Sequence, residues 1–282
     1  MLKILQYEYF FIVNKYLEMK IILEPILKFI ESTFSNKRKV KISNKECLYW
    51  AVKVLTTGVP WNHITPNQCH YSTVYKRFKQ WTTEHVFFNL WKQLVIDYQD
   101  KMLKIDSQWF KNLIIDSSMI KNIQGSDCIG KNHFDRNRLA TKVSLIIDKQ
   151  SIPLSCSFYP ANQHDATTID SSIKNVIGRI KRRKSKLIHN VIGDMGYIVN
   201  KQNKVRKINQ HGINMVTPHR KNQKNKITTK DKMLLQSRYI IENVFCRLKK
   251  FNRVAFRRDK SITSFKSFFY LGLVILTLKN TK

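Results

Sequence analysis

Residues 113–116 read Leu-Ile-Ile-Asp, a short apolar run that ends in a carboxylate. The pattern recurs at 187–194, Leu-Ile-His-Asn-Val-Ile-Gly-Asp, and a third acid, Glu242, lies inside a helical pattern. A carboxylate beside a core is costly unless a positive group pairs with it, and crowded carboxylates raise one another's pKa unless a cation neutralises them. The sequence therefore predicts that two strand-end aspartates, Asp116 and Asp194, converge with Glu242 on bound divalent metal.

The chain is strongly basic. It holds 51 Lys and Arg against 19 Asp and Glu, a formal net charge of +32, and the excess is spread along the chain. Mixed charges would keep a protein soluble without this bias, so nucleic acid is the favoured partner, ahead of an anionic membrane. A hydrophobic share of 43% argues against global disorder. A basic protein with converging carboxylates indicates metal-dependent chemistry on a polyanion.

The cysteines and the apolar segments do not indicate secretion or a membrane. The five cysteines are scattered and form no Cys-x-x-Cys pair, which is typical of a reduced intracellular protein without a disulfide framework or zinc ribbon. Lys3, Glu8 and Lys15 interrupt the apolar N-terminus, so we expect no signal peptide. The apolar run 268–278 is too short to span a bilayer and is expected to be a buried last helix.

Helical patterns dominate the first third of the chain. Helices are expected at about 21–35, from 44 to 58, from 72 to 81 and at about 84–98. Ser43 begins a capping box for the second helix, and Ser72 is expected to cap the third. Lys76, Arg77 and Lys79 would form the exposed face of that third helix. The pattern fits either a helix-turn-helix DNA-binding unit or a packed helical subdomain with solvated lysines.

Strand patterns follow from about residue 110. Strands are expected at 113–117, 140–148, 151–159, 187–193 and 213–217, with a helix at about 166–180. This order fits an α/β sheet that starts with an antiparallel hairpin. Two basic stretches, 181–184 and 218–232, are expected to be loops. The second, which contains Arg220 and Lys221, is either solvated or grips a nucleic-acid backbone.

The helix around Glu242 carries a charged stripe. Arg238, Glu242 and Lys249 are spaced 4 and then 7 residues apart, which places them on one side of a helix. Such pairs often stabilise an exposed helix by a few tenths of a kcal/mol. The rest of this helix is apolar, so the alternative is that the stripe faces a functional site.

These motifs resemble the DDE transposases of bacterial insertion sequences, of the insertion-sequence-five type. The resemblance covers about residue 22 to residue 279, and each motif alone is weak, but their order and spacing are specific. In chain order, the matching segments are Gly58-Val59-Pro60-Trp61, Ser72 to Trp81, Ile115-Asp116-Ser117-Ser118, Thr141-Lys142, Pro153-Leu154, Ala161 to Asp165, Gly193 to Tyr197, and Arg238 with Glu242 and Lys249.

The resemblance implies an α/β fold: an RNase H-like mixed-sheet catalytic domain with flanking helices, preceded by a small all-helical domain. We expect an N-terminal extension at 1–20, a helical DNA-binding-type domain at 21–108 and the catalytic domain at 109–282. Asp116 would lie on the first strand, Asp194 after the fourth and Glu242 on a following helix.

The resemblance also implies the cofactor and the partner. The three carboxylates would hold two Mg²⁺ ions, with Mn²⁺ able to substitute, and the partner would be double-stranded DNA, both transposon ends and target. A homodimer is expected in the DNA complex, inside the cell and away from membranes. The residues expected to bind DNA are Arg238, Lys249, Lys76, Arg77, Lys79, Arg220 and Lys221.

Two features qualify the resemblance. Relatives with the fuller signature carry a tyrosine where this chain has Leu235, which removes any DNA contact that the tyrosine would make. The pair His164-Asp165 stands alone after a strand and is interpreted as a loop-shaping or supporting element. Two alternatives remain open: a metal-dependent DNA nuclease on the same fold, and a non-catalytic DNA-binding protein derived from a transposon.

The net charge of +32 predicts that DNA binding weakens steeply with salt. Each neutralised phosphate contributes roughly −0.9 to the slope of log K against log salt concentration, because binding releases counterions. Affinity measured between about 50 and 200 mM salt should therefore fall by orders of magnitude. A flat response would contradict the assignment of the basic residues to the DNA backbone.

Overall fold

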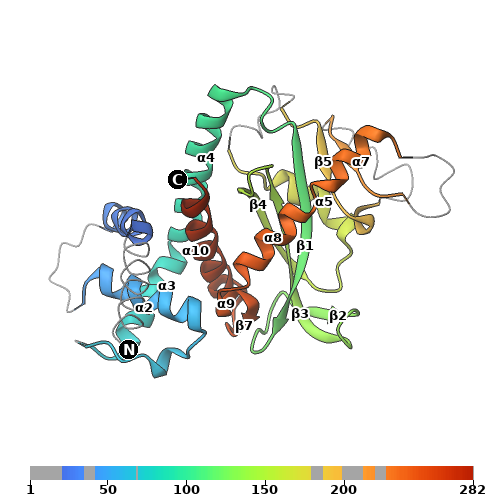
Figure 1. Ribbon diagram of the computed structural model, residues 1–282. Helices are drawn as coiled ribbons and strands as arrows, with labels where there is room; N and C mark the ends of the chain where they lie inside the picture. Colours follow the sequence, from blue (N-terminus) through green and yellow to red (C-terminus); the bar gives the residue numbers. More distant parts are fainter. Residues whose placement is uncertain are drawn as a thin grey trace, which may run out of the picture.

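The computed structural model describes residues 21–34, 42–67, 69–178, 187–198, 212–219 and 227–281. A helical part lies beside a curved mixed sheet, and the last helix, α10 (Ile262–Asn280), runs between the helical part and the sheet (Figure 1). The basic stretch 181–184, together with Arg220 and Lys221, lies outside the described residues.

The sheet is built around the long strand β1. The main strands are β1 (Asn112–Asn122), β3 (Arg138–Ile147), β4 (Pro153–Pro160), β5 (Asn190–Ile192) and β6 (Asn214–Val216). β1 pairs antiparallel with β3 on one side and parallel with β5 on the other, while β4 extends the β3 edge and β6 the β5 edge. The spatial order β4-β3-β1-β5-β6 confirms the expected RNase H-like sheet and its starting hairpin.

Two further strands were not expected from the sequence. They are β2 (Gly130–Asn132) and β7 (Phe256–Arg257), and they pair with β3 and β1 respectively. Strands this short have too few residues to show a hydrophobic period, so only the pairing in three dimensions defines them.

The N-terminal helices are close to the predicted ranges. A helix covers 21–33 and is followed by α2 (Asn44–Thr57), a 3₁₀ turn η1 (Trp61–His63), α3 (Tyr71–Thr83) and α4 (Val86–Ile105). Ser43 caps α2 as predicted, by accepting a hydrogen bond from the Glu46 N–H, and Gly58 ends it at φ 74°. Ser72 is not the cap of α3, because the cap is His70, two residues earlier, whose side chain accepts a hydrogen bond from the Ser72 N–H.

The elements that follow β4 differ in length from the predictions. They are α5 (Asp165–Lys174), a 3₁₀ turn η3 (Met195–Tyr197), α7 (Thr229–Gln236), α8 (Tyr239–Leu248) and α9 (Asn252–Ala255). The helix expected to reach residue 180 ends at Lys174. Of the stretch 218–232 that was expected to be a loop, residues 229–232 belong to α7, because Thr228 accepts a hydrogen bond from the Asp231 N–H and so starts a helix.

Helix α10 forms a core with the N-terminal helices. Phe268 stacks on Phe78 of α3 with ring centroids 4.4 Å apart, and Tyr270 stacks on Trp91 of α4 at 5.7 Å. By length and composition α10 is apolar enough to cross a membrane, but most of it is buried inside the protein, as expected for a core helix. Because the C-terminal helix shares a core with α3 and α4, the expected domain division at residue 108 stays a prediction.

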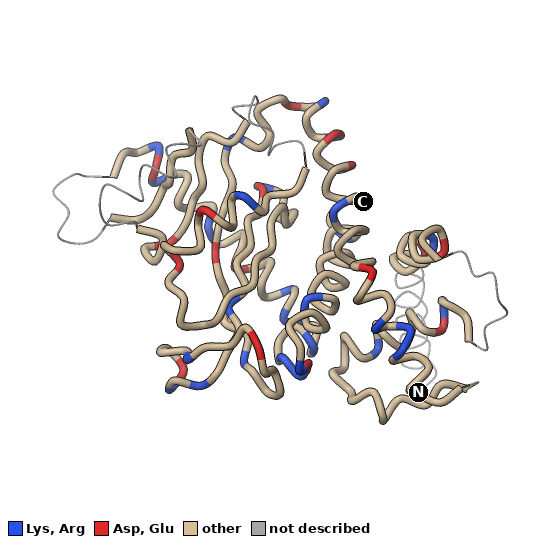
Figure 2. The backbone as a smooth tube through the Cα atoms, turned by 180° about the vertical axis from the view of Figure 1, so that it is seen from behind, with Lys and Arg blue, Asp and Glu red and all other residues tan. Residues whose placement is uncertain are grey.

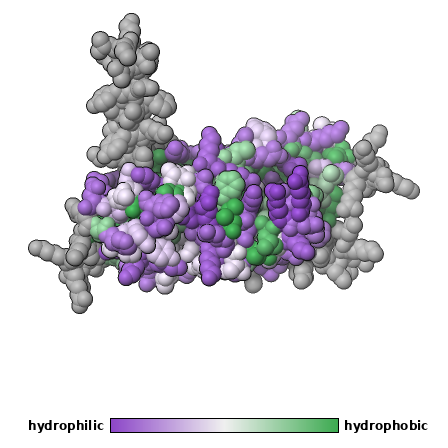
Figure 3. Space-filling model, turned by 90° about the horizontal axis from the view of Figure 1, so that it is seen from below, coloured by the Kyte–Doolittle hydropathy of each residue, from purple (hydrophilic) through white to green (hydrophobic). Residues whose placement is uncertain are grey.

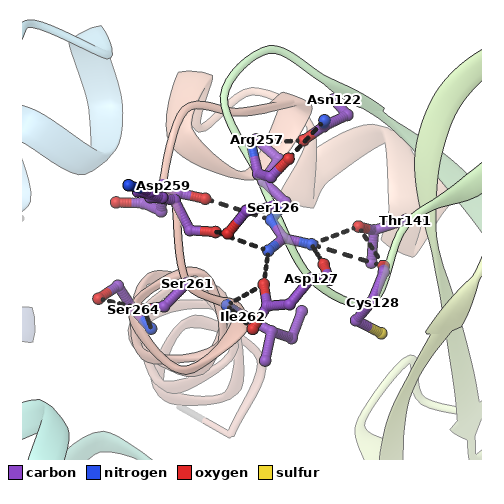
Figure 4. Close-up of polar contacts among 12 residues, drawn as sticks. Asn122, Ser126, Asp127, Cys128, Thr141, Arg257, Asp259, Ser261, Ile262 and Ser264 are labelled. Atoms are coloured by element: carbon purple, nitrogen blue, oxygen red, sulfur yellow. Dashed lines mark hydrogen bonds and ion pairs between the residues drawn. The ribbon is translucent and has the colours of Figure 1, made fainter.

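A buried arginine ties the C-terminal segment to the sheet (Figure 4). The Arg257 guanidinium is fully buried and donates to the Asp127 carboxylate and, at 2.8 Å, to Thr141 Oγ1 on β3. It also donates to the backbone carbonyls of Asp259 and Lys260. Asp127 in turn accepts from the Ile262 N–H at the start of α10. The Arg257 guanidinium and its partner Asp127 therefore hold the end of β1, strand β3 and the start of α10 together.

Replacing Arg257 with Met should destabilise the protein by at least about 3 kcal/mol, because several buried acceptors would lose their donor. Chemical denaturation measures this directly. The neighbouring exposed Arg258 supplies the matched control, since Arg258→Met should change the free energy of unfolding by less than about 0.5 kcal/mol. Equal effects of the two substitutions would contradict the role assigned to Arg257.

Candidate active site

Asp116 and Asp194 extend from the same end of two neighbouring parallel strands. Ile114 of β1 pairs with Ile192 of β5, and each aspartate follows two residues later. Asp194 leaves the strand and caps η3, where its Oδ1 accepts a hydrogen bond of 2.8 Å from the Gly196 N–H. The parallel register, set by the two apolar runs, thus brings together two carboxylates that are 78 residues apart in the chain.

The Asp116 carboxyl is held in an unfavourable environment for its charged form. Burial, followed by repulsion from Asp194 and Asp165, raises its pKa to about 6, although the Ser117 N–H and the Arg238 guanidinium favour the charged form. A carboxyl whose neighbours oppose its charge is a candidate ligand for a cation. Asp116 and Asp194 therefore suit a hard divalent ion, which prefers carboxylate oxygens.

A third aspartate, Asp165, lies at the same place. Its Oδ1 accepts from Ser117 Oγ at 2.7 Å and from the Lys142 ammonium at 2.8 Å, and Lys142 also donates to the Gln163 carbonyl. The Lys142 side chain is almost completely buried. A side chain at Gly196 would meet Asp194 Oδ1 at 3.0 Å and Asp165 Oδ2 at 3.2 Å, so these two carboxylates share one small space.

From the sequence alone, Asp165 is interpreted only as a loop-shaping or supporting residue. The sequence shows both Lys142 and Asp165. It does not show that they form an ion pair, because that depends on how α5 packs against β3. The structure adds the buried Tyr197 beside these groups. Burial, with Asp165 and Asp116 nearby, raises the pKa of its hydroxyl.

Glu242 lies on the helix α8. This helix crosses in front of β1 (Figure 1), with Ile241 and Val244 buried beneath it and the Glu242 side chain exposed on its first turn. Arg238, at the N-cap of α8, is close enough to lower the Asp116 pKa. In the part of the chain that the structure describes, no group of three His, Cys, Asp or Glu side chains is arranged to hold a metal ion. The placement of Glu242 as a third ligand is therefore a proposal.

The charged stripe of α8 is shorter than the sequence suggested. The regular helix covers only 239–248, so Arg238 and Lys249 are its two caps, although both keep right-handed helical backbone angles. The Lys249 side chain is exposed, whereas Arg238 is partly buried.

The basic residues of α3 have different surroundings. Lys76 is exposed, but Arg77 donates to Asn44 Oδ1 at 2.6 Å and so ties α3 to α2. Lys79 donates to Ser264 Oγ of α10 at 3.2 Å. Of the three, Lys76 presents its charge most freely to a partner.

The charge is distributed over the whole molecule. Seen from behind, Lys and Arg occur along both the helical part and the sheet, with acidic residues interspersed among them (Figure 2). Seen from below, the surface is mainly hydrophilic, and hydrophobic residues form only small separate areas (Figure 3). These views favour a large polyanion over an apolar partner.

Comparison with known proteins identifies a family. The family model described as a transposase DDE domain matches residues 119–262, slightly more than half of the 282 residues. The match includes Asp194 and Glu242 and starts three residues after Asp116. Among solved structures, the chain is similar to the catalytic domain of the Mos1 mariner transposase, with 14% identity and a TM-score of 0.27 over 68% of this chain and 89% of that chain. Comparison with curated protein sequences gives no match.

The raised pKa of Asp116 predicts that its carboxylate destabilises the metal-free fold at neutral pH. The folded-state pKa of about 6 lies above the ordinary 3.8, so the protonated form stabilises the fold at low pH and this contribution is lost as the pH rises through 6. In EDTA at pH 7.5, Asp116→Asn should therefore be more stable than the original chain, by up to about 2 kcal/mol, and the difference should shrink towards pH 5.

Thermal melts across this pH range measure the difference, and the exposed Asp97→Asn is the control. An Asp116→Asn variant that is equally or less stable at pH 7.5 would contradict the electrostatic account of the site.

Proposed function

The chain belongs to the DDE transposase family, and we propose that it cuts DNA at the ends of a transposable element and joins the freed ends to target DNA. Asp116, Asp194 and Glu242 would be its catalytic carboxylates. The observation that carries the proposal is the parallel β1–β5 register, which sets Asp116 and Asp194 side by side on an otherwise strongly basic protein. The protein would act inside the cell, on double-stranded DNA and as a homodimer.

Transposases of this family generally use divalent metal, and the residues of this site fit such an ion. Asp116 and Asp194 offer oxygen ligands whose mutual repulsion a cation would relieve. Glu242 would complete the set from α8, for two Mg²⁺ ions or Mn²⁺ in their place. When bound, such ions would supply positive charge that stabilises the negative charge developing at a phosphodiester.

The chain's own cations would orient the DNA. Arg238 lies at the edge of the carboxylate cluster, and its Nε is buried without a hydrogen-bond partner among the described residues. Its guanidinium would bind a phosphate beside the scissile bond, where charge develops in the transition state. Lys249, exposed at the other end of α8, would bind the DNA backbone further along.

The reaction would have two steps. In the first, water attacks the phosphodiester at the transposon end and releases a 3′-hydroxyl. In the second, that hydroxyl attacks a phosphodiester of the target in line, so that its oxygen bonds to phosphorus while the opposite P–O bond breaks and the target strand leaves with a 3′-hydroxyl. Neither step uses a covalent protein intermediate, so the site requires no Ser, Cys or Tyr nucleophile. A nuclease on the same fold would stop after the first step.

Replacing Asp116, Asp194 or Glu242 singly with Ala should abolish Mg²⁺-dependent cleavage of end-containing DNA, while DNA binding stays nearly normal. Each variant removes an oxygen ligand but no cationic DNA contact. Cleavage and strand transfer are read on labelled duplexes, and binding by gel shift. Asp97→Ala, exposed and on α4, is the matched control and should remain active.

The same assay separates the alternatives. Arg238→Ala should fold normally but lose most cleavage, since the Arg238 Nε makes no hydrogen bond within the described residues, whereas a contact to transition-state charge would be lost. Cleavage without joining would favour the nuclease. Retained cleavage in all three carboxylate variants would refute the proposed function.

A further inference from the structure

A groove with a volume of about 750 Å³ lies between α3 and the start of α10. One wall carries aromatic rings, Trp61, Tyr71 and Tyr75, and the other carries the cations Arg258 and Lys260. Gln124, which also lines it, follows Asp116 by eight residues along and beyond β1. At roughly 3.3 Å per strand residue, the six strand residues that follow Asp116, up to the end of β1 at Asn122, span about 20 Å, so the groove lies at the far end of β1 from the carboxylates. We propose that this groove binds an unpaired nucleotide of the DNA, and this inference rests on the proposed DNA substrate.

The aromatic wall offers a face for a base. The Tyr75 side chain is 39% exposed, although it is a large aromatic residue in a concave surface. It packs edge-on against Trp61 with ring centroids 5.5 Å apart, and Trp61 rests on the buried Phe78 at 5.2 Å. The rings are thus fixed from behind and open towards the groove. Aromatic faces of this kind bind bases by stacking and tolerate any base sequence.

The opposite wall offers positive charge for the phosphate. Arg258 and Lys260 are exposed, and Lys79 reaches from α3 to Ser264 in the first turn of α10. Asp127 also lines the groove, but its carboxylate is already bound by Arg257 and by the Ile262 N–H. The net character of this wall is therefore cationic, which suits a phosphate between the two walls.

A buried ion pair lines the same groove with unused hydrogen-bonding capacity. Arg253 and Asp259 are 5% and 8% exposed, and Arg253 Nη1 lies 3.5 Å from Asp259 Oδ1. Arg253 also donates to the Val59 carbonyl. Arg253 Nε and Asp259 Oδ2 have no hydrogen-bond partner among the described residues. Both atoms are buried, so a bound group would reach them only from the groove that their residues line, and the edge of a nucleobase carries the acceptor and the donor that they lack.

The shape favours an unpaired nucleotide over a duplex. A groove of this volume is in the range of small-molecule sites, whereas a duplex lies across a broad surface. In a duplex the faces of the bases are stacked on one another and unavailable to Tyr75. The unpaired nucleotide could belong to a single-stranded tract or be a single base turned out of a duplex, and the chemistry that binds it is the same.

The test compares Tyr75→Ala with the original chain on three DNA ligands of one sequence: a single strand, a blunt duplex, and a duplex with one unpaired base. Binding is followed by fluorescence anisotropy. We expect Tyr75→Ala to weaken binding of the single strand at least 10-fold, and binding of the blunt duplex less than 2-fold, in line with the loss of about one stacked base. Tyr75→Phe, which keeps the stacking face, should bind like the original chain.

Tyr49→Ala is the matched control, because Tyr49 is a similarly exposed tyrosine on α2 outside the groove. If Tyr75→Ala also weakens binding of the duplex with one unpaired base, the groove accepts a base turned out of a duplex. If only binding of the single strand weakens, the groove accepts a nucleotide of a single-stranded tract. An equal loss on the blunt duplex, or no loss on any ligand, would overturn the proposal while leaving the proposed function intact. Failure to bind any DNA would overturn both.

Discussion

The parallel pairing of β1 with β5 is the constraint on which the candidate site depends. Because Ile114 pairs with Ile192, the residues that follow them leave the two strands at the same end of the sheet. This pairing brings Asp116 beside Asp194. Burial and then repulsion from Asp194 raise the pKa of Asp116, and two cations from different elements lie at this cluster of carboxylates. Arg238 approaches from the start of α8, while Lys142 from β3 holds the neighbouring Asp165. The sheet thus provides rigid positions for charges that would otherwise separate.

The C-terminal end of β1 lies beside the buried Arg257. There Arg257, buried in the short strand β7, binds the Asp127 loop, Thr141 and the start of α10 (Figure 4). Because α10 also packs against α3 and α4, this anchor sets the helical part against the sheet and forms the aromatic and cationic groove at their junction. One strand therefore connects the carboxylate site with the groove proposed to hold an unpaired nucleotide. DNA bound along β1 would contact both.

Much of the fold could be predicted because its buried strands are marked by continuous apolar runs, as in 113–116. Two kinds of feature could not. The strands β2 and β7 are too short to carry a period and exist through pairing alone. The contacts of Lys142 with Asp165 and of Arg257 with Asp127 join residues 23 and 130 positions apart, and nothing local distinguishes those side chains from solvated ones. The positions of Asp116 and Asp194 were predictable because each ends an apolar strand, whereas Glu242 lies on an exposed helical turn and its place as a third ligand stays a prediction.

The most direct test of the account is whether binding of a divalent ion displaces a proton from Asp116. Calorimetric titration of Mn²⁺ at pH 6, in buffers with different ionisation enthalpies, measures the protons released per ion bound. Because the Asp116 pKa is about 6, the carboxyl is about half protonated there, and a cation that ligates it must release about half a proton. The account predicts this release in the original chain and its loss in Asp116→Asn. Binding of Mn²⁺ with no proton release, or with the same release in both proteins, would contradict a cation shared by Asp116 and Asp194.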